Sequence, residues 1–382
     1  MGDTVGLMVG RRLLADTLAG KQTFEDVEFY MQAARRYGVE LFLFEPGGVA
    51  QHRRTVTGYV PTSRGELRRV VRKLPAVVYD RTSPKKKAPG AWLERQGVRV
   101  FNPPVRFDKY DAYQLLRRSW TARGYLPETH LLSDASLEWF ARTLKRGAEV
   151  FVKPRSGSLG RRVARFVPLK EGRCRYQWGE RSVTFASARS AWKMLIRQKG
   201  SKADRYIVQQ GIPLAEVSGK RFDLRVPVQR NSEGDWEVAA PRARLAGRLE
   251  YVTNVARGGS VEPNVRALYA RSLPDHHPDS IARTIESAAL DIASAIARKH
   301  PLMADLGLDM GVDKDGRPWL IEANIRPLRY TVEGVGDWAE AYHAPIGYAS
   351  YLLREDAAGE SLFASLFFRK TGPRYRSSRN WL

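Results

Sequence analysis

The chain has 382 residues, of which 64 are Lys or Arg and 41 are Asp or Glu, so its formal net charge is +23. Hydrophobic residues make up 43% of the sequence, which provides for a sizeable core and disfavours global disorder. The sequence contains one cysteine, Cys174, which excludes an intrachain disulfide and a cysteine-rich metal site. The charge favours polyanionic partners, namely nucleic acid, an anionic membrane, phosphates or acidic peptides.

The sequence also bears on localisation. No apolar stretch approaches the ~20 residues that a membrane-spanning helix needs, and the first residues lack the pattern of a signal peptide. The single cysteine fits a reducing compartment. We therefore expect a cytoplasmic protein without a membrane span.

The first hundred residues alternate between short apolar strands and helical segments. Strands are predicted at residues 4–9, 39–44 and 76–80, and helices at residues 24–36 and 67–73. This alternation predicts a small parallel α/β domain. No G-x-G-x-x-G motif follows the first strand, so a Rossmann dinucleotide site is not supported.

Proline residues and helix-start signals predict a domain boundary and the elements that follow it. The run Asn102-Pro103-Pro104 marks the end of the first domain. Asp108 is predicted to cap a helix that extends to Trp120. The elements expected after it are strands at 149–153 and 207–210, an antiparallel pair at 222–229 and 236–245, and a long helix at 281–299.

A flexible loop follows the predicted strand that ends at Lys153. Ser156, Gly157, Ser158 and Gly160 can direct backbone N–H groups at phosphate oxygens, and Lys153 adds a cation. The segment is not a Walker A loop, which needs Gly-Lys-Ser/Thr at a helix start. Most Gly/Ser loops are only loops, so this interpretation depends on the motifs that follow.

Arginines alternate on the predicted antiparallel pair. Asp223 and Arg225 share one face of the first strand, and Arg242 and Arg244 alternate on the second. A solvated strand face is the simpler interpretation, but repeated arginines favour bidentate binding of phosphate or carboxylate. A glycine turn then supplies more polar groups: Asn254, Arg257, Gly258 and Gly259.

Two carboxylates and an amide meet late in the chain. Asp309 and Glu322 lie on apolar runs joined by Asp313-Lys314-Asp315-Gly316, which is a hairpin signal. The hairpin folds Asp309 back beside Glu322, and the two-residue period of a strand turns Glu322 and Asn324 to one face. Converging carboxylate and amide oxygens suit Mg²⁺, which proteins share with phosphates. The sequence therefore indicates a nucleotide-dependent enzyme.

The order of these segments resembles that of an ATP-grasp ligase. A helix-start lysine, a strand lysine with a Gly/Ser loop, Asp-x-Arg, Asn-x-x-x-Gly-Gly and Asp…Glu-x-Asn follow one another between residues 106 and 330. Within that superfamily the chain is most similar to the YheC/YheD-type, endospore-coat-associated group. The closer match is carried by Phe107-Asp108-Lys109-Tyr110, Leu126-Pro127-Glu128-Thr129, Val252-Thr253-Asn254 and Gly258-Gly259.

This resemblance implies an α/β chain with the ATP-grasp fold, in which two α+β lobes grip ATP. It implies a pre-ATP-grasp α/β domain at residues 1–105 and an ATP-grasp domain at residues 106–330, with the lid-bearing lobe at about 125–210. Residues 331–382 would form a C-terminal helical extension and a basic tail.

The resemblance also implies binding roles, with ATP and two Mg²⁺ as cofactors. The residues implied to bind ATP are Lys109 and Lys153 at the phosphates, Ser156, Gly157, Ser158 and Gly160 in the lid, Gln209, Gln210 and Ile212 in a hinge that binds adenine through main-chain groups, and Asp223 at the ribose. The residues implied to hold the metal are Asp309, Glu322 and Asn324.

Catalysis and substrate binding are assigned in the same way. The residues implied to act in catalysis are Arg225, Arg244 and Asn254, with the arginines at the γ-phosphate or an acyl-phosphate. Those implied to contact the substrate are Arg257, Gly258, Gly259 and Arg326. Arg326 departs from the many relatives with a small residue there, so it either contacts an anionic substrate or crowds a degenerate site.

The implied activity is amide formation between amino acids, or onto a peptide or polymer, through an acyl-phosphate with release of ADP and phosphate. The positive charge suggests an acidic or polymeric acceptor. Two alternatives stay open: a non-catalytic structural protein of the forming spore coat that keeps the fold, and a polyanion-binding module. The basic tail at residues 369–382 gives little support to a nucleic-acid role.

Two histidines and the single cysteine are expected to play no part in a metal site or in catalysis. His276 and His277 precede the long predicted helix, in a turn that we expect Asp279 or Ser280 to cap, rather than forming a transition-metal site. Cys174 has arginine neighbours that could lower its pKa. No histidine base is recognisable near it, so it is expected to be a bystander thiol.

Overall fold

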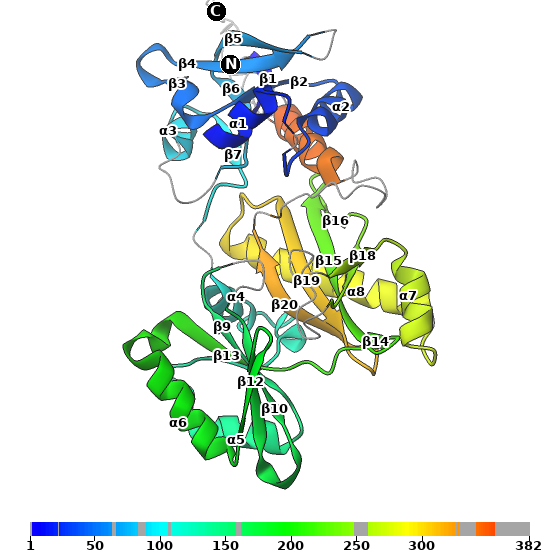
Figure 1. Cartoon of the computed structure of the whole chain (residues 1–382). Coiled ribbons are helices and arrows are strands. Elements are labelled where there is room, and N and C mark those ends of the chain that lie inside the picture. The colour runs from blue at the N-terminus through cyan, green and yellow to red at the C-terminus, as the bar shows by residue number, and fades with distance from the viewer. Residues whose placement is uncertain are drawn as a thin grey trace, which may run out of the picture.

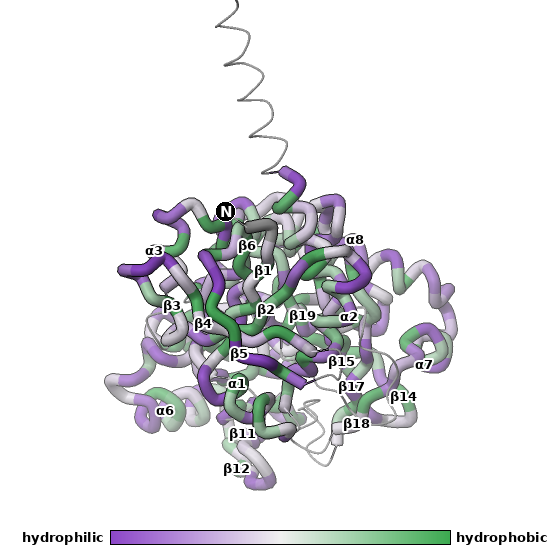
Figure 2. Tube along the Cα trace, turned by 90° about the horizontal axis from the view of Figure 1, so that it is seen from above, coloured by the Kyte–Doolittle hydropathy of each residue, from purple (hydrophilic) through white to green (hydrophobic). Residues whose placement is uncertain are grey.

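The computed structural model describes residues 2–21, 23–62, 66–82, 89–105, 108–157, 162–247, 259–325, 327 and 341–355. Its strands form three sheets, which Figure 1 shows one above the other: an N-terminal sheet at the top, the β14–β20 sheet in the middle and the β8–β13 sheet at the bottom. Seen from above, hydrophilic segments are concentrated toward the periphery (Figure 2). Short 3₁₀ turns connect elements at Pro46–Gly48, Gln51–Arg53, Arg123–Tyr125, Lys170–Gly172 and Gly200–Arg205.

The N-terminal sheet is parallel at its centre, as the alternating sequence predicts. Its order is β3-β4-β2-β1-β6-β7, and β5 pairs with β4. The strands are β1 (Gly2–Met8), β2 (Glu40–Phe44), β3 (Val49–Ala50), β4 (Thr55–Pro61), β5 (Leu67–Lys73), β6 (Pro75–Asp80) and β7 (Arg99–Phe101). The helices are α1 (Arg11–Leu18), α2 (Val27–Tyr37) and α3 (Gly90–Arg95).

The helix predicted at residues 67–73 is wrong, because this segment is strand β5. Seven consecutive residues pair with β4, from Leu67 opposite Pro61 to Lys73 opposite Thr55. So short a helix is marginal on its own, and the β-branched pair Val70-Val71 fits a strand better. Pairing with β4 therefore makes this segment a strand rather than a helix.

The bottom sheet is antiparallel and has the order β12-β11-β10-β9-β13-β8. Helices α5 and α6 pack against it around a core that includes Phe140, Phe166 and Leu195. The elements are β8 (Thr129–Leu131), α5 (Leu137–Lys145), β9 (Val150–Pro154), β10 (Ala164–Pro168), β11 (Cys174–Trp178), β12 (Arg181–Phe185), α6 (Ala188–Lys199) and β13 (Tyr206–Gln210).

Helix α4 (Lys109–Leu116) precedes this lobe and starts where the sequence predicts. The Asp108 carboxylate accepts hydrogen bonds from the backbone N–H groups of Tyr110 and Asp111, which is N-cap geometry. The predicted extension to Trp120 is wrong: beyond Leu116 the backbone bonds tighten to a three-residue spacing, such as Ser119 N to Leu116 O at 2.9 Å.

The middle sheet has the order β18-β17-β15-β19-β20, with β14 and β16 also paired to β15. Helix α8 packs against it through Ile281, Ile285, Ile292 and Ile296. The elements are β14 (Glu216–Val217), β15 (Lys220–Arg230), β16 (Trp236–Val238), β17 (Arg242–Leu245), β18 (Ser260–Glu262), α7 (Val265–Ser272), α8 (Pro278–Lys299), β19 (Asp305–Val312) and β20 (Pro318–Asn324).

Two details of this sheet differ from the sequence predictions. The strand expected at 236–245 is two strands, β16 and β17, separated by a segment that contains Pro241, which has no N–H to donate to a ladder. Helix α8 is capped by His277 rather than by Asp279 or Ser280, since the His277 ring accepts from the Asp279 N–H and Pro278 takes the first helical position.

A further helix, residues 341–355, returns to the N-terminal sheet and is drawn in orange in Figure 1. Its buried face contributes Tyr342, Ile346, Ala349 and Leu352 to the same core as the strands β1 and β2. The core of the first domain therefore includes residues from late in the chain.

A buried polar network joins the N-terminal sheet to the middle sheet. The fully buried Arg81 guanidinium contacts Glu25 at 2.5 Å and Asp305 at 3.1 Å, and donates to the Pro327 carbonyl at 2.8 Å. Burial alone would lower the pKa of Arg81, but these carboxylates hold it well above its usual value. Asn102 donates to the Asp305 carbonyl at 3.1 Å, and its own oxygen accepts from the Asp305 N–H at 2.9 Å.

We expect Arg81→Leu to lower the free energy of unfolding by about 3–5 kcal/mol, because it leaves the carboxylates of Glu25 and Asp305 buried without their cation. Urea denaturation followed by circular dichroism measures this change. The matched control is Arg72→Leu, whose ion pair with Glu40 is 42% and 48% exposed and should change stability by less than about 1 kcal/mol. Equal losses in the two variants would contradict the role assigned to the network.

Candidate active site

The predicted site residues lie on facing elements of the bottom and middle lobes. Lys153 is on β9, Gln209 is on the neighbouring strand β13, and Lys109 begins α4. The middle sheet carries the other predicted side chains on adjacent strands: Asp223 and Arg225 on β15, Arg244 on β17, Asp309 on β19, and Glu322 and Asn324 on β20.

Lys109 connects the two lobes. Its Nζ lies 3.0 Å from the Glu322 Oε1 and donates to the Gly157 carbonyl at 2.8 Å. Its backbone N–H donates to the Arg155 carbonyl, and Arg155 Nε lies 2.8 Å from the Asp108 carboxylate. The start of α4 is thus fixed to the loop after β9, and its lysine reaches the acidic hairpin.

Lys153 lies in the same electrostatic neighbourhood. Its Nζ donates to the Gln209 Oε1 at 2.6 Å, and the Gln209 Nε2 donates to the Thr129 hydroxyl at 2.9 Å. Burial, and the nearby Lys109 cation, lower the pKa of Lys153 to about 8, although the carboxylate of Glu322 opposes that shift. The hinge role implied for Gln209 concerns its main-chain groups, and its side chain orients Lys153.

The strand register sets the acidic and guanidinium groups side by side. Asp309 lies directly opposite Glu322 on one side and opposite Arg225 on the other, so the predicted return of Asp309 to Glu322 is confirmed. Arg225 Nε is 3.0 Å from the Asp309 Oδ1, and Arg244 Nη2 is 3.2 Å from the same oxygen.

Arg244 also binds Asp223, which lies opposite it in the β15–β17 pair. Two hydrogen bonds of 2.7 Å join the guanidinium to the two carboxylate oxygens. Burial would lower the pKa of Arg244, but Asp223 and Asp309 raise it far above its usual value. Because both oxygens of Asp223 accept from Arg244, the ribose role implied for Asp223 would require this pair to rearrange.

The charges of the site favour an anion. Four cations, Lys109, Lys153, Arg225 and Arg244, face three carboxylates, Asp223, Asp309 and Glu322, which leaves a formal excess of one positive charge. These side chains are largely shielded from solvent, so their interactions are screened less than those of surface charges. An anionic ligand is therefore favoured over a cationic one.

The predicted metal ligands fit Mg²⁺ by their chemistry. Two carboxylates and one amide are hard donors on paired strands. The Oδ1 of Asp309 is buried against the guanidinium groups of Arg225 and Arg244, and the Nδ2 of Asn324 is buried without a hydrogen-bond partner among the described residues. No group of three or more His, Cys, Asp or Glu side chains in that part of the chain is arranged to hold a metal, so the set depends on Asn324 as its third member.

The predicted hinge connects the bottom and middle lobes. The Gln210 N–H donates to the Glu128 carbonyl at 2.9 Å, and the Ile212 carbonyl accepts from the Leu214 N–H at 2.8 Å. Gly211 packs so closely on Glu149 that a Cβ at this glycine would lie 2.8 Å from the Glu149 Cβ.

Glu149 makes a contact between the two lobes that the sequence did not predict. Its carboxylate lies 3.0 Å from Arg165 of β10 and 3.0 Å from Arg221 of β15, so it joins the two lobes beside the hinge. The partners are far apart in sequence and belong to no recognised motif, so the pattern offered no signal for this contact.

Part of the predicted set lies outside the described residues. These are Ser158 and Gly160 of the lid, Asn254 of the catalytic set, and Arg257, Gly258 and Arg326 of the substrate set. Of their described neighbours, Ser156 and Gly157 are exposed after β9, and Gly259 immediately precedes β18.

Cys174 is a bystander, as expected. Its side chain is buried in the core of the bottom lobe. Burial raises the pKa of its thiol to about 11, so the arginine neighbours do not activate it. A search of the described helices found none with the length and apolar character of a membrane span.

Comparison with known proteins gives consistent matches. Residues 97–352 match the family model described as YheC/D like ATP-grasp. Endospore coat-associated protein YheD of Bacillus subtilis (strain 168) is 25% identical over 346 residues, covering 85% of this chain and 73% of that protein. Endospore coat-associated protein YheC of the same organism is 22% identical over 301 residues, covering 74% and 80%.

The fold also matches a solved structure. The ATP-grasp ligase PsnB, complexed with minimal precursor, aligns with a TM-score of 0.50 at 15% identity, over 92% of this chain and 100% of that chain. At this identity the likeness shows the fold alone. The resemblance to the YheC/YheD-type group and the ATP-grasp fold, both inferred from the sequence, are confirmed.

The site geometry makes a prediction about Lys153. In protein labelled at the lysine Cε, one resonance should titrate near pH 8 and disappear in Lys153→Arg. Glu322→Gln should lower that pKa further, because the carboxylate stabilises the ammonium form. Glu286→Gln, an exposed change on α8, is the control and should leave it unchanged. An ordinary pKa near 10.5 for Lys153 would refute the buried, cation-flanked environment.

Proposed function

Because this chain belongs to the YheC/D-like ATP-grasp family, we propose that it is an ATP-dependent carboxylate–amine ligase that forms an amide bond and releases ADP and phosphate. One observation carries the proposal: Lys109, at the start of α4, lies 3.0 Å from Glu322 of the middle sheet and donates to the Gly157 carbonyl of the bottom lobe at 2.8 Å. Lys153, Arg225 and Arg244 surround the same acidic pair. Cations from both lobes thus converge on two carboxylates.

We assign the binding roles from this arrangement. Lys109 and Lys153 would hold the phosphates of ATP, and Asp309, Glu322 and Asn324 would hold Mg²⁺. The ions would supply neutralisation of the phosphate charge. The loop through Ser156 and Gly157, held to Lys109 by the Gly157 carbonyl, would cover the phosphates and exclude water.

The reaction proceeds in two displacements. The oxygen of a substrate carboxylate attacks the γ-phosphorus, and the bond from that phosphorus to the ADP oxygen breaks, which gives an acyl-phosphate. An amine then attacks the acyl carbon, the carbon–oxygen bond to phosphate breaks, and the amine loses a proton. Arg225 and Arg244 stabilise the charge on the transferring phosphoryl group, so positioning and electrostatics supply the rate.

Substrates of this class are amino acids or peptides. The net charge of +23 supports an acidic or polymeric acceptor, because its field raises the local concentration of anions. The proposal also includes a cytoplasmic location and the three domain ranges inferred from the sequence, which are 1–105, 106–330 and 331–382.

A second candidate function comes from the names of the relatives. YheD and YheC are called endospore coat-associated proteins. A coat assembly role without turnover would use the fold and the basic surface and would not need Glu322. Binding of a polyanion through the net charge would likewise not need Glu322, and its affinity would fall strongly with added salt.

We expect the wild-type protein to release ADP from ATP and Mg²⁺ when supplied with the right amino acids or peptides, with a matching mass gain in the acceptor. Glu322→Gln should lower kcat by at least about 100-fold, because a carboxylate at the phosphate site is lost. Glu286→Gln on the exposed face of α8 should leave kcat unchanged.

Two results would contradict the ligase proposal. One is the absence of nucleotide binding in calorimetry at millimolar ATP. The other is an intact biological role in cells that carry Glu322→Ala, since coat assembly or polymer binding that survives this change does not depend on catalysis.

The affinity for ATP should fall as the pH rises above about 8. The phosphates bind the ammonium form of Lys153, and above its pKa of about 8 that group must take up a proton before it can contribute. The dissociation constant should therefore rise by up to about tenfold per pH unit. Calorimetry between pH 7 and 9.5 measures this, and Lys153→Arg, which stays charged, should flatten the profile. A flat wild-type profile would contradict the assignment.

A further inference from the structure

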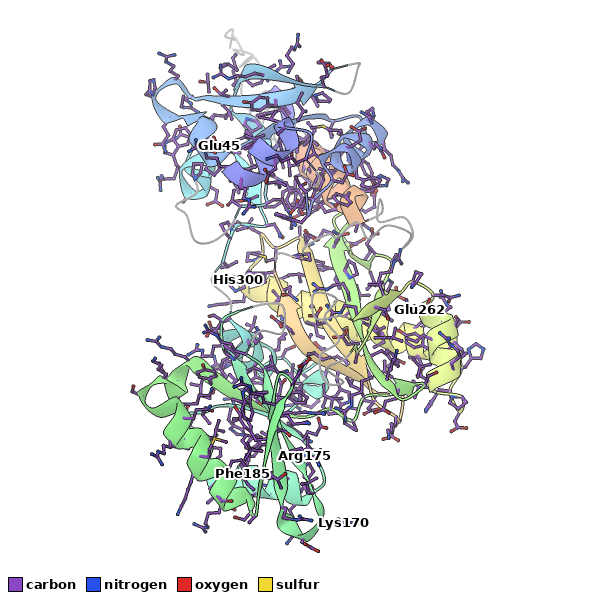
Figure 3. All side chains as sticks on the ribbon, viewed as in Figure 1. Glu45, Lys170, Arg175, Phe185, Glu262 and His300 are labelled. Atoms are coloured by element: carbon purple, nitrogen blue, oxygen red, sulfur yellow. The ribbon has the colours of Figure 1, made fainter. Side chains whose placement is uncertain are left out.

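The N-terminal domain contains a pocket that plays no part in the site described above. Its volume is about 320 Å³, within the range of sites for small molecules. Its polar lining residues are Glu45, Thr57, Tyr59 and Arg69. Figure 3 labels Glu45 in this domain, at the opposite end of the molecule from Lys170 and Arg175 of the bottom lobe.

The position of the pocket follows from the fold. Glu45 directly follows β2, a strand parallel to β1, and open α/β sheets bind ligands at the carboxyl ends of such strands. The next residues form the tight turn Pro46–Gly48. At Gly48 a Cβ would lie 2.4 Å from the Thr57 carbonyl oxygen, so only glycine lets this turn approach β4.

The loop that carries Glu45 forms one wall of the pocket, and the β4–β5 hairpin forms the other. Tyr59 lies directly opposite Arg69, so their side chains share one face of the hairpin. Thr57 lies two residues before Tyr59 and points to the same side. The hairpin thus presents a hydroxyl, a phenol and a guanidinium to the loop that carries Glu45.

The charged groups of the pocket are unused within the described part of the chain. Glu45 and Arg69 form neither a side-chain hydrogen bond nor an ion pair there, although other charged residues of this sheet do, such as Arg72 with Glu40 at 2.6 Å. The two opposite charges line one pocket without pairing with each other. A ligand that reaches both would satisfy them.

The sign of these charges restricts the ligand. The Glu45 carboxylate repels a simple anion, and the Arg69 guanidinium repels a simple cation. A small molecule that carries both an ammonium and a carboxylate is complementary to both groups. We propose that this pocket binds a free α-amino acid, with its ammonium group at Glu45 and its carboxylate at Arg69.

This site goes beyond the proposed ligase reaction, because it is built by the N-terminal domain and uses none of the residues assigned to ATP. Its occupancy would report the amino-acid supply independently of the nucleotide. Glu45 is half-buried and Arg69 is exposed at the rim. Glu45 should therefore contribute more to affinity, since solvent screens the charge of Arg69.

The test is calorimetry of the full chain without nucleotide, using glycine, L-alanine and L-glutamate as probes. We expect saturable binding of at least one probe. Glu45→Gln should weaken it at least tenfold, and Arg69→Gln severalfold. The matched controls are Glu66→Gln, just before β5, and Arg68→Gln within it. They remove the same charges but do not line the pocket, and should bind as the wild type does. Circular dichroism checks that each variant is folded.

Four outcomes would overturn the proposal. No binding of any probe by the wild type would do so, as would unchanged binding by folded Glu45→Gln. N-acetylglycine and glycinamide each lack one charge, so equal affinity for either would show a simple anion or cation site. Tighter binding of diglycine than of glycine would show a peptide terminus as the ligand and overturn the assignment to a free amino acid. Because no ATP is added, none of these outcomes depends on the ligase proposal.

Discussion

The side chain of Lys109 is the group that links the acidic pair of the middle sheet to the loop after β9, because it contacts both Glu322 and the Gly157 carbonyl. It joins the first residue of α4 to the last strand of the middle sheet at 3.0 Å. In this state the cations of the site are paired with its carboxylates, as Arg225 and Arg244 are with Asp309. A bound polyphosphate would have to replace these pairings, so the protein exchanges internal ion pairs for contacts with its ligand.

The lowered pKa of Lys153 reflects the energetic cost of this arrangement. A buried ammonium beside another cation is disfavoured. Gln209, which is itself held by Thr129, orients the amine by accepting its hydrogen bond. The lysine is therefore preorganised toward a position where only an incoming anion fully stabilises its charge.

The sequence predicted features that depend on local pattern. The hairpin turn and the strand period brought Asp309 beside Glu322, and Asp108 caps α4 as expected, because both outcomes are set within a few residues. Features that depend on distant partners were not predictable. Strand β5 exists through its pairing with β4, Glu149 binds arginines of two lobes, and Gln209 turns to Lys153 through a contact across neighbouring strands.

The helix at residues 341–355 has a consequence for how the molecule is made. It fills the core beneath β1 and β2, together with Tyr30. On the ribosome, the first strands and α2 emerge long before this helix is synthesised, so the part of the core that the helix covers stays exposed while both later lobes are translated. The N-terminal domain can therefore complete its core only after residues 341–355 have been synthesised.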